Sequence, residues 1–549
     1  MKTDNYSPEE TEGVLKPFCT DVERPVRMTN PFAAVPHPLC VAAAGMLMET
    51  VRQREDWRDE VEQGKMFGVL VVERTDGSLG YLSAYSGQIG GRSDWKGFVP
   101  AVFDYLQPDG YFCREEAAIS AINRQLEDKD LHSELVAERS RVDTLEIREK
   151  EWLQTFRSTM QSARQSRQER RGNGMLSQEE EAMLVRESQF MKAELRRMKK
   201  ASTQRMEEAR RRLDSLEERI AGLSAQRAGR SDALQRWLFD RFVMLNAKGE
   251  RKSLTRIFMD ATTHLPPGGA GECCAPKLLQ YAFLHGLRPV GMAEFWWGAS
   301  PKTEIRRHGF FYPACRGKCK PILDFMLQGL DVEPLRLPYA VQEAQVRVVY
   351  EDAFLAVVDK PCGVLSVPGK SGQKSVYDFM RRRWPDADGP LVVHRLDMDT
   401  SGLLVLARDK HTHQRLQAQF RRRAVKKVYV AVLVHRPDLS EGWVNLPLRP
   451  DPYDRPRQVV DSMHGKPSRT FFRVVGQAAA GVRVELIPYT GRTHQLRVHC
   501  AHTDGLNAPI LGDCLYGQPA GRLYLHAARL SFVHPVDGRT MEFVSEVPF

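Results

Sequence analysis

The chain has 549 residues, a formal net charge of +10 and ten cysteines. This length predicts more than one domain, and the excess of Lys and Arg favours a polyanionic partner such as nucleic acid. So few cysteines in so long a chain argue against a disulfide-built secreted scaffold, and the apolar stretch 32–48 is too short and broken to span a membrane. The polar first residues do not resemble a signal peptide, so we expect a cytoplasmic protein.

Residues 1–26 form an expected polar tail, after which residues 27–113 change to apolar runs punctuated by glycine. The runs 68–72 and 79–83 predict strands, and the Gln-Ile-Gly-Gly stretch at 88–91 predicts a turn. We interpret 27–113 as the first part of an accessory domain.

Residues 114–241 are rich in Glu, Arg, Lys, Gln, Leu and Met and contain no proline. Apolar residues recur three and four apart on two arms, which is the spacing of a heptad helix seam. The earlier arm carries Leu135, Val142, Leu145, Trp152 and Phe156, and the later arm carries Met206, Ala209, Leu213, Leu216, Ile220 and Leu223. A Gly-Asn-Gly break at 172–174 separates the arms, and Ser177 with Glu180 predicts a capping box that restarts the helix. We therefore predict an antiparallel coiled-coil hairpin, which is either a spacer with a solvated face or a basic arm that touches ribosomal or transfer RNA.

Residues 242–330 return to the glycine-rich globular texture of 27–113. This similarity favours one split α/β accessory domain, into which the hairpin is inserted. Four cysteines fall in this part, and we interpret them as buried reduced thiols, with a metal site as the alternative. They are Cys273, Cys274, Cys315 and Cys319. A proline-spaced linker is expected at 331–345.

The last part, 346–549, combines short, glycine-punctuated strands with few helices, which predicts an α+β domain with a mixed or mostly antiparallel sheet. A first strand over 346–352 is followed by a second that ends at the Lys-Pro turn at 360–361. Further strands are expected at 427–433 and 484–488. Asp409 is placed to cap a helix that ends near Arg422, with basic residues at its end.

The stretch His394-Arg395-Leu396-Asp397-Met398-Asp399-Thr400-Ser401-Gly402 is the most informative of the chain. It puts the carboxylate of Asp397 in a turn directly after an apolar strand at 391–393, with an Arg and a His beside it. Cations next to such a carboxylate keep it ionised and aimed. A second block at 490–499 reads Thr-Gly-Arg-Thr-His-Gln-Leu-Arg-Val-His, and a third pairs Gly-Asp at 512–513 with Tyr-Gly at 516–517.

In this order, the blocks resemble the RluA family of RNA pseudouridine synthases, and the resemblance covers 346–549 only. It implies the pseudouridine synthase fold, with a central mixed, largely antiparallel sheet around an active-site cleft. It also implies the reaction, in which a uridine in RNA is detached from C1′ of its ribose, rotated and rejoined through C5. Because the turnover is an isomerisation, neither a cofactor nor a metal is implied.

The resemblance also implies catalytic roles. Asp397 matches the family's catalytic aspartate, which either attacks C1′ or takes a proton from C2′, and the sequence leaves both routes open. Arg497, expected on a strand, matches the arginine that pairs with this aspartate and holds it charged. Tyr429 matches the tyrosine that stacks on the target base and is a candidate for the proton transfer at C5.

The expected substrate-binding residues are His394, Arg395, Arg492 and His494. Among them, Arg395 matches an arginine that fills the space left when the target base leaves its stack. The expected partner is structured RNA, ribosomal or transfer, with no DNA or membrane partner, and a contact of the hairpin with a ribosomal particle is a further prediction. The alternative is an RNA-binding or ribosome-assembly protein that uses the synthase fold as a clamp. The complete set of Asp397, Tyr429 and Arg497 favours the enzyme, because a pure binder has no physical need of all three.

Overall fold

The computed structural model describes residues 13–174, 176–262, 264–302, 304–335, 346–369, 373–452 and 454–549. It separates into two compact units, one of them Tyr105–Leu238 and the other Met1–Asp104 together with Phe239–Phe549. Most of the expected linker, residues 336–345, and the first part of the expected tail, residues 1–12, lie outside the described residues.

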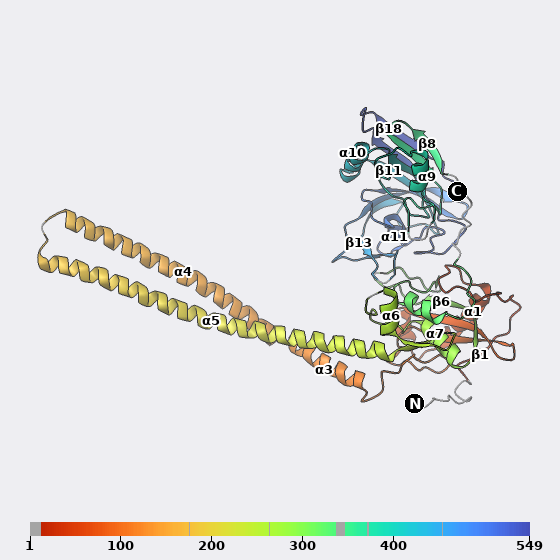
Figure 1. Cartoon of the computed structure of the whole chain (residues 1–549), viewed down its shortest axis with the longest axis horizontal. Coiled ribbons are helices and arrows are strands. Elements are labelled where there is room, and N and C mark those ends of the chain that lie inside the picture. The colour runs from red at the N-terminus through yellow and green to blue at the C-terminus, as the bar shows by residue number, and fades with distance from the viewer. Residues whose placement is uncertain are drawn as a thin grey trace. The chain divides into compact units, whose positions relative to one another are not determined.

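The smaller unit is built of long helices (Figure 1). They are α3 (Tyr111–Leu126), α4 (Lys129–Gly172) and α5 (Gln178–Arg241), the last of which runs past the end of the unit. Ion pairs join α4 to α5, with Arg139 bonded to Glu217, Glu149 to Arg205, and Arg171 to Glu181. As the paired residues on α4 rise in number, their partners on α5 fall in number, so the two helices run antiparallel.

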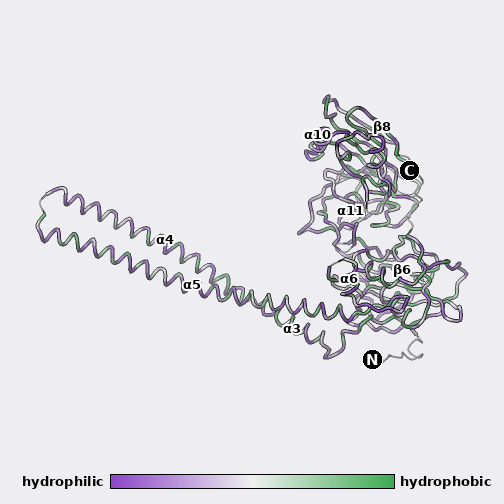
Figure 2. The backbone as a smooth tube through the Cα atoms, viewed as in Figure 1, coloured by the Kyte–Doolittle hydropathy of each residue, from purple (hydrophilic) through white to green (hydrophobic). Residues whose placement is uncertain are grey.

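The contact between α4 and α5 is narrow, and hydrophobic residues appear along both helices only at intervals (Figure 2). Val142 and Ala209 are buried, as the heptad pattern predicts. Trp152 is instead 44% exposed, with the guanidinium of Arg205 5.8 Å from its ring centroid. Its neighbour Leu153 is half-buried instead.

The predicted capping box at the start of α5 is confirmed. The Ser177 N–H donates to the Glu180 carboxylate at 2.8 Å, and the Glu180 N–H donates to the Ser177 hydroxyl at 3.2 Å. These two bonds satisfy backbone groups that the first helical turn leaves without partners.

In the larger unit, strands that precede the long helices in the sequence pair with strands that follow them. Together they form one sheet in the order β1-β3-β2-β6-β7. They are β1 (Lys16–Pro17), β2 (Lys65–Glu73), β3 (Leu79–Tyr85), β6 (Arg288–Trp297) and β7 (Phe311–Tyr312). Each neighbouring pair is antiparallel, so the expected α/β class is wrong for this sheet. The unbroken apolar run of β2 is typical of a parallel strand covered on both faces, but here α1 (Pro38–Gln53) and α7 (Cys274–Leu284) supply that cover to an antiparallel one.

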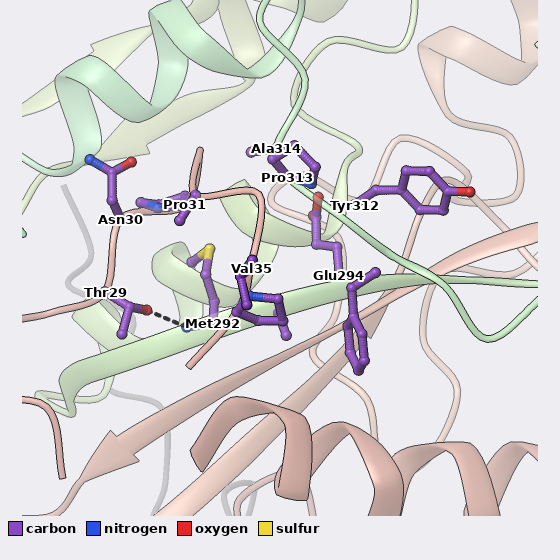
Figure 3. Close-up of a pocket in the computed structure, with 13 residues that line it drawn as sticks. Thr29, Asn30, Pro31, Val35, Met292, Glu294, Tyr312, Pro313 and Ala314 are labelled. Carbon is purple, nitrogen blue, oxygen red and sulfur yellow. Dashed lines mark hydrogen bonds between the residues drawn. The ribbon is translucent and has the colours of Figure 1, made fainter. Parts of the chain in front are cut away.

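Shorter elements complete this part. They are α2 (Arg58–Glu62), β4 (Val243–Leu245), β5 (Arg251–Ser253), α6 (Leu254–Thr262) and α8 (Cys319–Met326). A small cavity beside β6 is lined by residues that include Thr29, Met292 and Glu294 (Figure 3). The Met292 N–H donates to the Thr29 hydroxyl at 3.3 Å. Burial raises the pKa of Glu294 to about 7, so this carboxyl group titrates near neutral pH.

The second sheet has the order β12-β15-β16-β11-β17-β10-β9-β8, with β18 paired to β17. Its strands are β8 (Arg347–Glu351), β9 (Leu355–Lys360), β10 (Ser401–Ala407), β11 (Lys426–Leu433), β12 (Glu441–Asn445), β15 (Arg469–Ala478), β16 (Gly481–Pro488), β17 (Leu525–Val533) and β18 (Thr540–Val544). Of the pairings that the structure describes here, β10 with β17 is parallel and the others are antiparallel. The expected mixed, largely antiparallel sheet is therefore confirmed.

Three helices and a small ribbon accompany this sheet. They are α9 (Val376–Arg383), α10 (Lys410–Arg421) and α11 (Gln495–Ala501), with β13 (Leu448–Pro450) paired to β14 (Gln458–Val460). Asp409 caps α10 as predicted, because its carboxylate accepts the Thr412 N–H at 2.8 Å. No helix among the described residues is long and apolar enough to cross a membrane.

Candidate active site

Asp397 lies in the loop that leads into β10. Its carbonyl accepts the Thr400 N–H at 3.1 Å, which closes a tight turn. The strand expected at 391–393 is reduced to one isolated bridge between Val392 and Leu406, since Leu391 has a positive φ of 59° that breaks an extended run. The carboxylate is therefore carried by a loop that other groups must hold in place.

Buried polar groups fix this loop through its backbone. The Lys360 ammonium, at the end of β9, donates to the carbonyls of Met398 and Val364 at 2.8 and 2.7 Å. The Ser366 hydroxyl donates to the Leu396 carbonyl at 2.8 Å, and the Leu396 N–H donates back at 3.1 Å. Both residues flanking Asp397 are thus anchored. The Lys-Pro pair stood out in the sequence as a turn, but its anchoring role was not predicted.

Tyr429 and Arg497 come from different elements and both lie near Asp397. Tyr429 is on β11, opposite Leu486 of β16, as the predicted strand requires. Arg497 is on the helix α11, so the expected strand is wrong there. His494, the N-cap of this helix, has a positive φ of 52°, and the Arg492 N–H donates to the Gln495 carboxamide oxygen at 3.0 Å. This sharp turn starts a helix in a segment whose alternating apolar residues are typical of a strand.

The carboxylate that binds Arg497 is Asp513 and not Asp397. The guanidinium donates from Nε and Nη2 to the two Asp513 oxygens at 2.8 and 2.6 Å. The expected pairing with Asp397 is corrected here, because Asp513 is fixed by the N–H groups of Leu515 and Tyr516 and presents both oxygens to the planar fork. Sequence reasoning quoted Gly512-Asp513 as part of a motif without assigning it this role.

Charges of both signs are concentrated around Asp397. Burial lowers the pKa of Arg497, but the carboxylate of Asp513, and less strongly those of Asp397 and Asp399, raise it well above its ordinary value. Burial raises the pKa of Asp513, but the Arg497 guanidinium outweighs this effect and leaves the pKa below its ordinary value. Burial, and next the negative charge of Asp397, raise the pKa of the Tyr429 phenol, which therefore keeps its proton at neutral pH.

Of the two histidines expected at the substrate, His494 is buried and His394 is half-buried, and both are in contact with neighbouring protein groups. The His394 ring stacks on Phe420 at 4.6 Å between centroids, and its Nε2 accepts the Val405 N–H at 3.2 Å. Burial, with Lys427 nearby, lowers its pKa to about 3. His394 is therefore part of the scaffold. His494 Nδ1 lies 2.9 Å from the Tyr516 hydroxyl, and burial lowers its pKa to about 4, although Asp397 opposes this shift.

Arg395 and Arg492 are exposed and remain available to an incoming substrate. The Arg492 Nε donates to the Pro467 carbonyl at 3.2 Å, which leaves its other guanidinium donors free for solvent or ligand. Arg395 follows the half-buried His394 and precedes the anchored Leu396. Both arginines are therefore attached to the same segments that carry Asp397 and Arg497.

The four cysteines of 242–330 do not converge as one set. The thiols of Cys273, Cys315 and Cys319 interact with one another, and the Cys319 N–H donates to the Cys315 sulfur at 3.3 Å. Cys274 instead points to the Met66 carbonyl, with 3.5 Å between sulfur and oxygen. Among the described residues, no group of three or more His, Cys, Asp or Glu side chains is arranged to hold a metal ion.

Comparisons with known proteins find matches to part of this chain. Residues 355–502 match the model of the RNA pseudouridylate synthase family. The dual-specificity RNA pseudouridine synthase RluA of Escherichia coli K12 is 44% identical over 216 residues, which are 38% of this chain and 96% of that protein. The RluA of Vibrio cholerae is 44% identical over 196 residues, 35% of this chain and 78% of that protein. A solved structure, human RNA pseudouridylate synthase domain containing 4, is 30% identical, covers 37% of this chain and 88% of that one, and has a TM-score of 0.31.

The sheet, the Asp397 loop and these matches define an isomerase that acts on RNA. The chain belongs to the RNA pseudouridylate synthase family, and within it is similar to the RluA enzymes. Its activity is the conversion of uridine in RNA to pseudouridine. The match with the family model lies in the last part of the chain.

Proposed function

We propose that the chain isomerises specific uridines of structured ribosomal or transfer RNA, with Asp397 as the group that acts on the ribose. The observation that carries this proposal is the gathering of Asp397, Tyr429 and Arg497 from a loop, a strand and a helix into one charged site. An ionised carboxylate held in such a place can attack C1′, or can remove the proton from C2′. Both routes break the bond between base and ribose, and both need the same three residues.

Tyr429 is proposed to stack on the target base. Its side chain is half-buried and the pKa of its phenol is raised, so it is neutral at physiological pH. A neutral phenol can pack against the base and donate a hydrogen bond, but it cannot take the proton from C5 without first losing its own. Stacking is therefore the better supported of the two roles expected for Tyr429.

The proposed substrate contacts lie around this site. Arg395 and Arg492 are exposed and cationic, and the end of α10 adds Arg421, Arg422 and Arg423, which are partly or fully exposed. Such a rim suits phosphate groups of the RNA backbone. Arg395 is proposed to occupy the space that the flipped base leaves in its stack. The proposed location of the protein is the cytoplasm, where these RNAs are modified.

The accessory part is proposed to choose the RNA. In this proposal 27–113 and 242–330 form one domain and 114–241 is a hairpin inserted into it, which is supported by the sheet that joins β2 to β6. Between Arg157 and Arg205 the chain has twelve Lys or Arg and six Glu. This half of the hairpin, next to its turn, is therefore the cationic one, and it is proposed to touch the RNA of a ribosomal particle or a transfer RNA.

Tritium release tests the catalytic assignment. RNA labelled at uridine C5 is prepared from cells that lack the gene, and the label released is measured with the full chain. Asp397→Asn is expected to lower release by at least about a thousandfold, as loss of a nucleophile does. Asp388→Asn, the same change at an exposed carboxylate, is the matched control and is expected to retain activity. Retained activity in Asp397→Asn contradicts the assignment.

Mapping the modified positions tests the target. Ribosomal, transfer and messenger RNA from the same cells are treated with the wild-type protein and sequenced after chemical marking of pseudouridine. New pseudouridine at defined positions of ribosomal or transfer RNA supports the proposal. Modification confined to messenger RNA contradicts it, although the catalytic assignment then still stands on tritium release.

A further inference from the structure

One end of the catalytic sheet carries aromatic side chains on its outer face. Along β12, β15 and β16 alternate residues point to opposite faces, and the inward set, which includes Val444, Phe472 and Leu486, is buried in the core. The outward set is open to solvent instead. Trp443 on β12 is 41% exposed, and Tyr489, just after β16, is 50% exposed.

These outward residues form a contiguous cluster. The Trp443 ring lies 4.8 Å from that of Tyr489 and 5.2 Å from that of Phe471, both in edge-to-face contact. The guanidinium carbon of Arg469 stands 3.8 Å from the Trp443 ring centroid. Among the described residues, no carboxylate forms an ion pair with Arg469, so its charge is left for an outside partner. We call Trp443, Tyr489 and Arg469 the Trp443 surface.

The Trp443 surface is bonded to the segment that carries Arg497. The Gln495 side chain donates to the Arg469 carbonyl at 3.0 Å and accepts from the Thr490 hydroxyl at 2.7 Å. The same carboxamide oxygen accepts the Arg492 N–H. Gln495 begins α11, the helix of Arg497. Tyr489 shortly precedes Arg492 in the sequence. A strand of RNA that leaves the site past Arg492 therefore reaches Tyr489 next.

We propose that the Trp443 surface binds an unpaired base of the RNA substrate, in the strand that continues from the target uridine past Arg492 to the outer face of the sheet, with Arg469 on its phosphate or stacked on its ring. Exposed aromatic rings combined with an unneutralised arginine are the features by which proteins hold single-stranded nucleic acid. The alternative is a purely structural role, in which the Arg–Trp stack only shields the edge strand β12. That role does not need Tyr489 half-exposed beside the stack. The proposal rests on RNA being the substrate and adds the kind of RNA, one with an unpaired base near its target.

Binding and kinetics together test the proposal on the full chain. The probes are a single-stranded oligouridine of about ten nucleotides, a site size typical of such surfaces, and an RNA duplex of equal length. Trp443→Ala and Tyr489→Ala are each expected to weaken oligouridine binding roughly five- to a hundredfold and to leave duplex binding unchanged. In tritium release KM should rise while kcat stays at the wild-type value. Trp443→Phe should restore most of the affinity, because it keeps a ring to stack on.

The matched controls are Val544→Ala, another exposed apolar residue, and Arg529→Ala, an exposed arginine opposite it on β17. Both should behave as wild type. Unchanged oligouridine affinity in Trp443→Ala overturns the proposal, and so does a loss of kcat alone, which marks a structural role. If wild-type protein modifies neither ribosomal nor transfer RNA, the proposed target fails, yet the oligouridine measurement still decides the Trp443 surface.

Discussion

Arg497 faces three carboxylates, and the geometry divides their roles. Asp513 takes the two-point hydrogen bond and is fully buried, while Asp397 and Asp399 act on Arg497 through their charge. The pair with Asp513 therefore sets the plane of the guanidinium, and the rest of its positive charge is left to Asp397. Asp513 is a positioning residue in this arrangement.

Asp513→Asn tests that role. It leaves a buried cation without its counter-charge, so we expect a loss of about 3–5 kcal/mol in unfolding free energy. Activity should fall by at least about a hundredfold, because a guanidinium that has left its plane no longer directs its charge at Asp397. Chemical unfolding and tritium release measure the two effects.

The double variant Arg497→Met with Asp513→Leu separates stability from catalysis. Replacing both partners of a buried ion pair by apolar residues is often neutral for stability. We expect a smaller loss of stability than in Asp513→Asn, because no buried charge is left unpaired, although the Leu515 and Tyr516 N–H groups lose their acceptor. We expect no activity. Recovery of activity in this variant contradicts a role for Arg497 in the reaction.

The catalytic part has four histidines that burial keeps neutral. Burial lowers the pKa of His494, His499 and His526 to about 4, and that of His394 to about 3, from an ordinary value of 6.5. Between these values the unfolded chain binds more protons than the folded one, so stability rises with pH through this window and is lost as pH falls. Each histidine adds a slope of up to about 1.4 kcal/mol per pH unit.

Urea unfolding between pH 6.5 and 4 measures that slope. His526 lies between the hydroxyls of Ser401 and Ser545, at 2.9 and 3.1 Å. His526→Gln can keep one of these contacts but cannot take up a proton, so its pH slope should be shallower than that of the wild type. Parallel slopes for the two proteins would show that His526 is not a source of the effect.

At the scale of elements, the parallel pairing of β10 with β17 depends on Gly402. Its φ is +113°, and a Cβ there would lie 2.4 Å from the Ala527 carbonyl oxygen. Gly402→Ala must push the two strands apart next to the loop of Asp397, at a cost of about 2–4 kcal/mol. Thermal unfolding should show the loss, with lower activity.

Gly521→Ala is the control for that substitution, since a Cβ at Gly521 meets nothing within 4 Å. It should leave the midpoint of unfolding unchanged. Equal midpoints for Gly402→Ala and Gly521→Ala would mean that the sheet absorbs the added methyl group.

The sequence predicted strands well where hydrophobic runs are long, and poorly where a single residue changes the backbone. The long hydrophobic runs of β11 and β16 correctly predicted that Tyr429 lies on a strand. In contrast, Arg497 was expected on a strand, because the left-handed turn at His494 cannot be read from an alternating apolar pattern. For the site, Asp397, Tyr429 and Arg497 were predicted through the resemblance, and their roles stay predictions. The anchors Lys360 and Asp513 were missed because their partners are far away in sequence.

At the scale of the whole molecule, charge is expected to govern RNA affinity. Replacing Arg196, Lys199 and Lys200 by Gln removes cations from the basic half of the hairpin. If they contact phosphate, affinity for structured RNA falls and the slope of log affinity against log salt shrinks by up to about 0.9 per lost contact. Binding titrations at several salt concentrations measure both quantities.

Exposed acids on the same helix provide the control. Glu179→Gln and Glu218→Gln change the charge of α5 by neutralising anions, and they should not reduce the salt slope. If the cation substitutions leave the slope of log affinity against log salt unchanged, the hairpin is a spacer. The kcat of tritium release from the labelled RNA should be the same in all these variants, because the hairpin is not part of the reaction.

The pairing of β2 with β6 also has a consequence for synthesis. Phe67 lies opposite Phe295, so the apolar edge of β2 has no strand beside it until the ribosome has made the entire hairpin. At translation rates of about 5–20 residues per second this wait lasts on the order of ten to forty seconds. During that time β2 and β3 form an incomplete, aggregation-prone sheet, while the charged helices that follow can already form. A nascent chain of this protein is therefore expected to need a chaperone at β2 until β6 emerges.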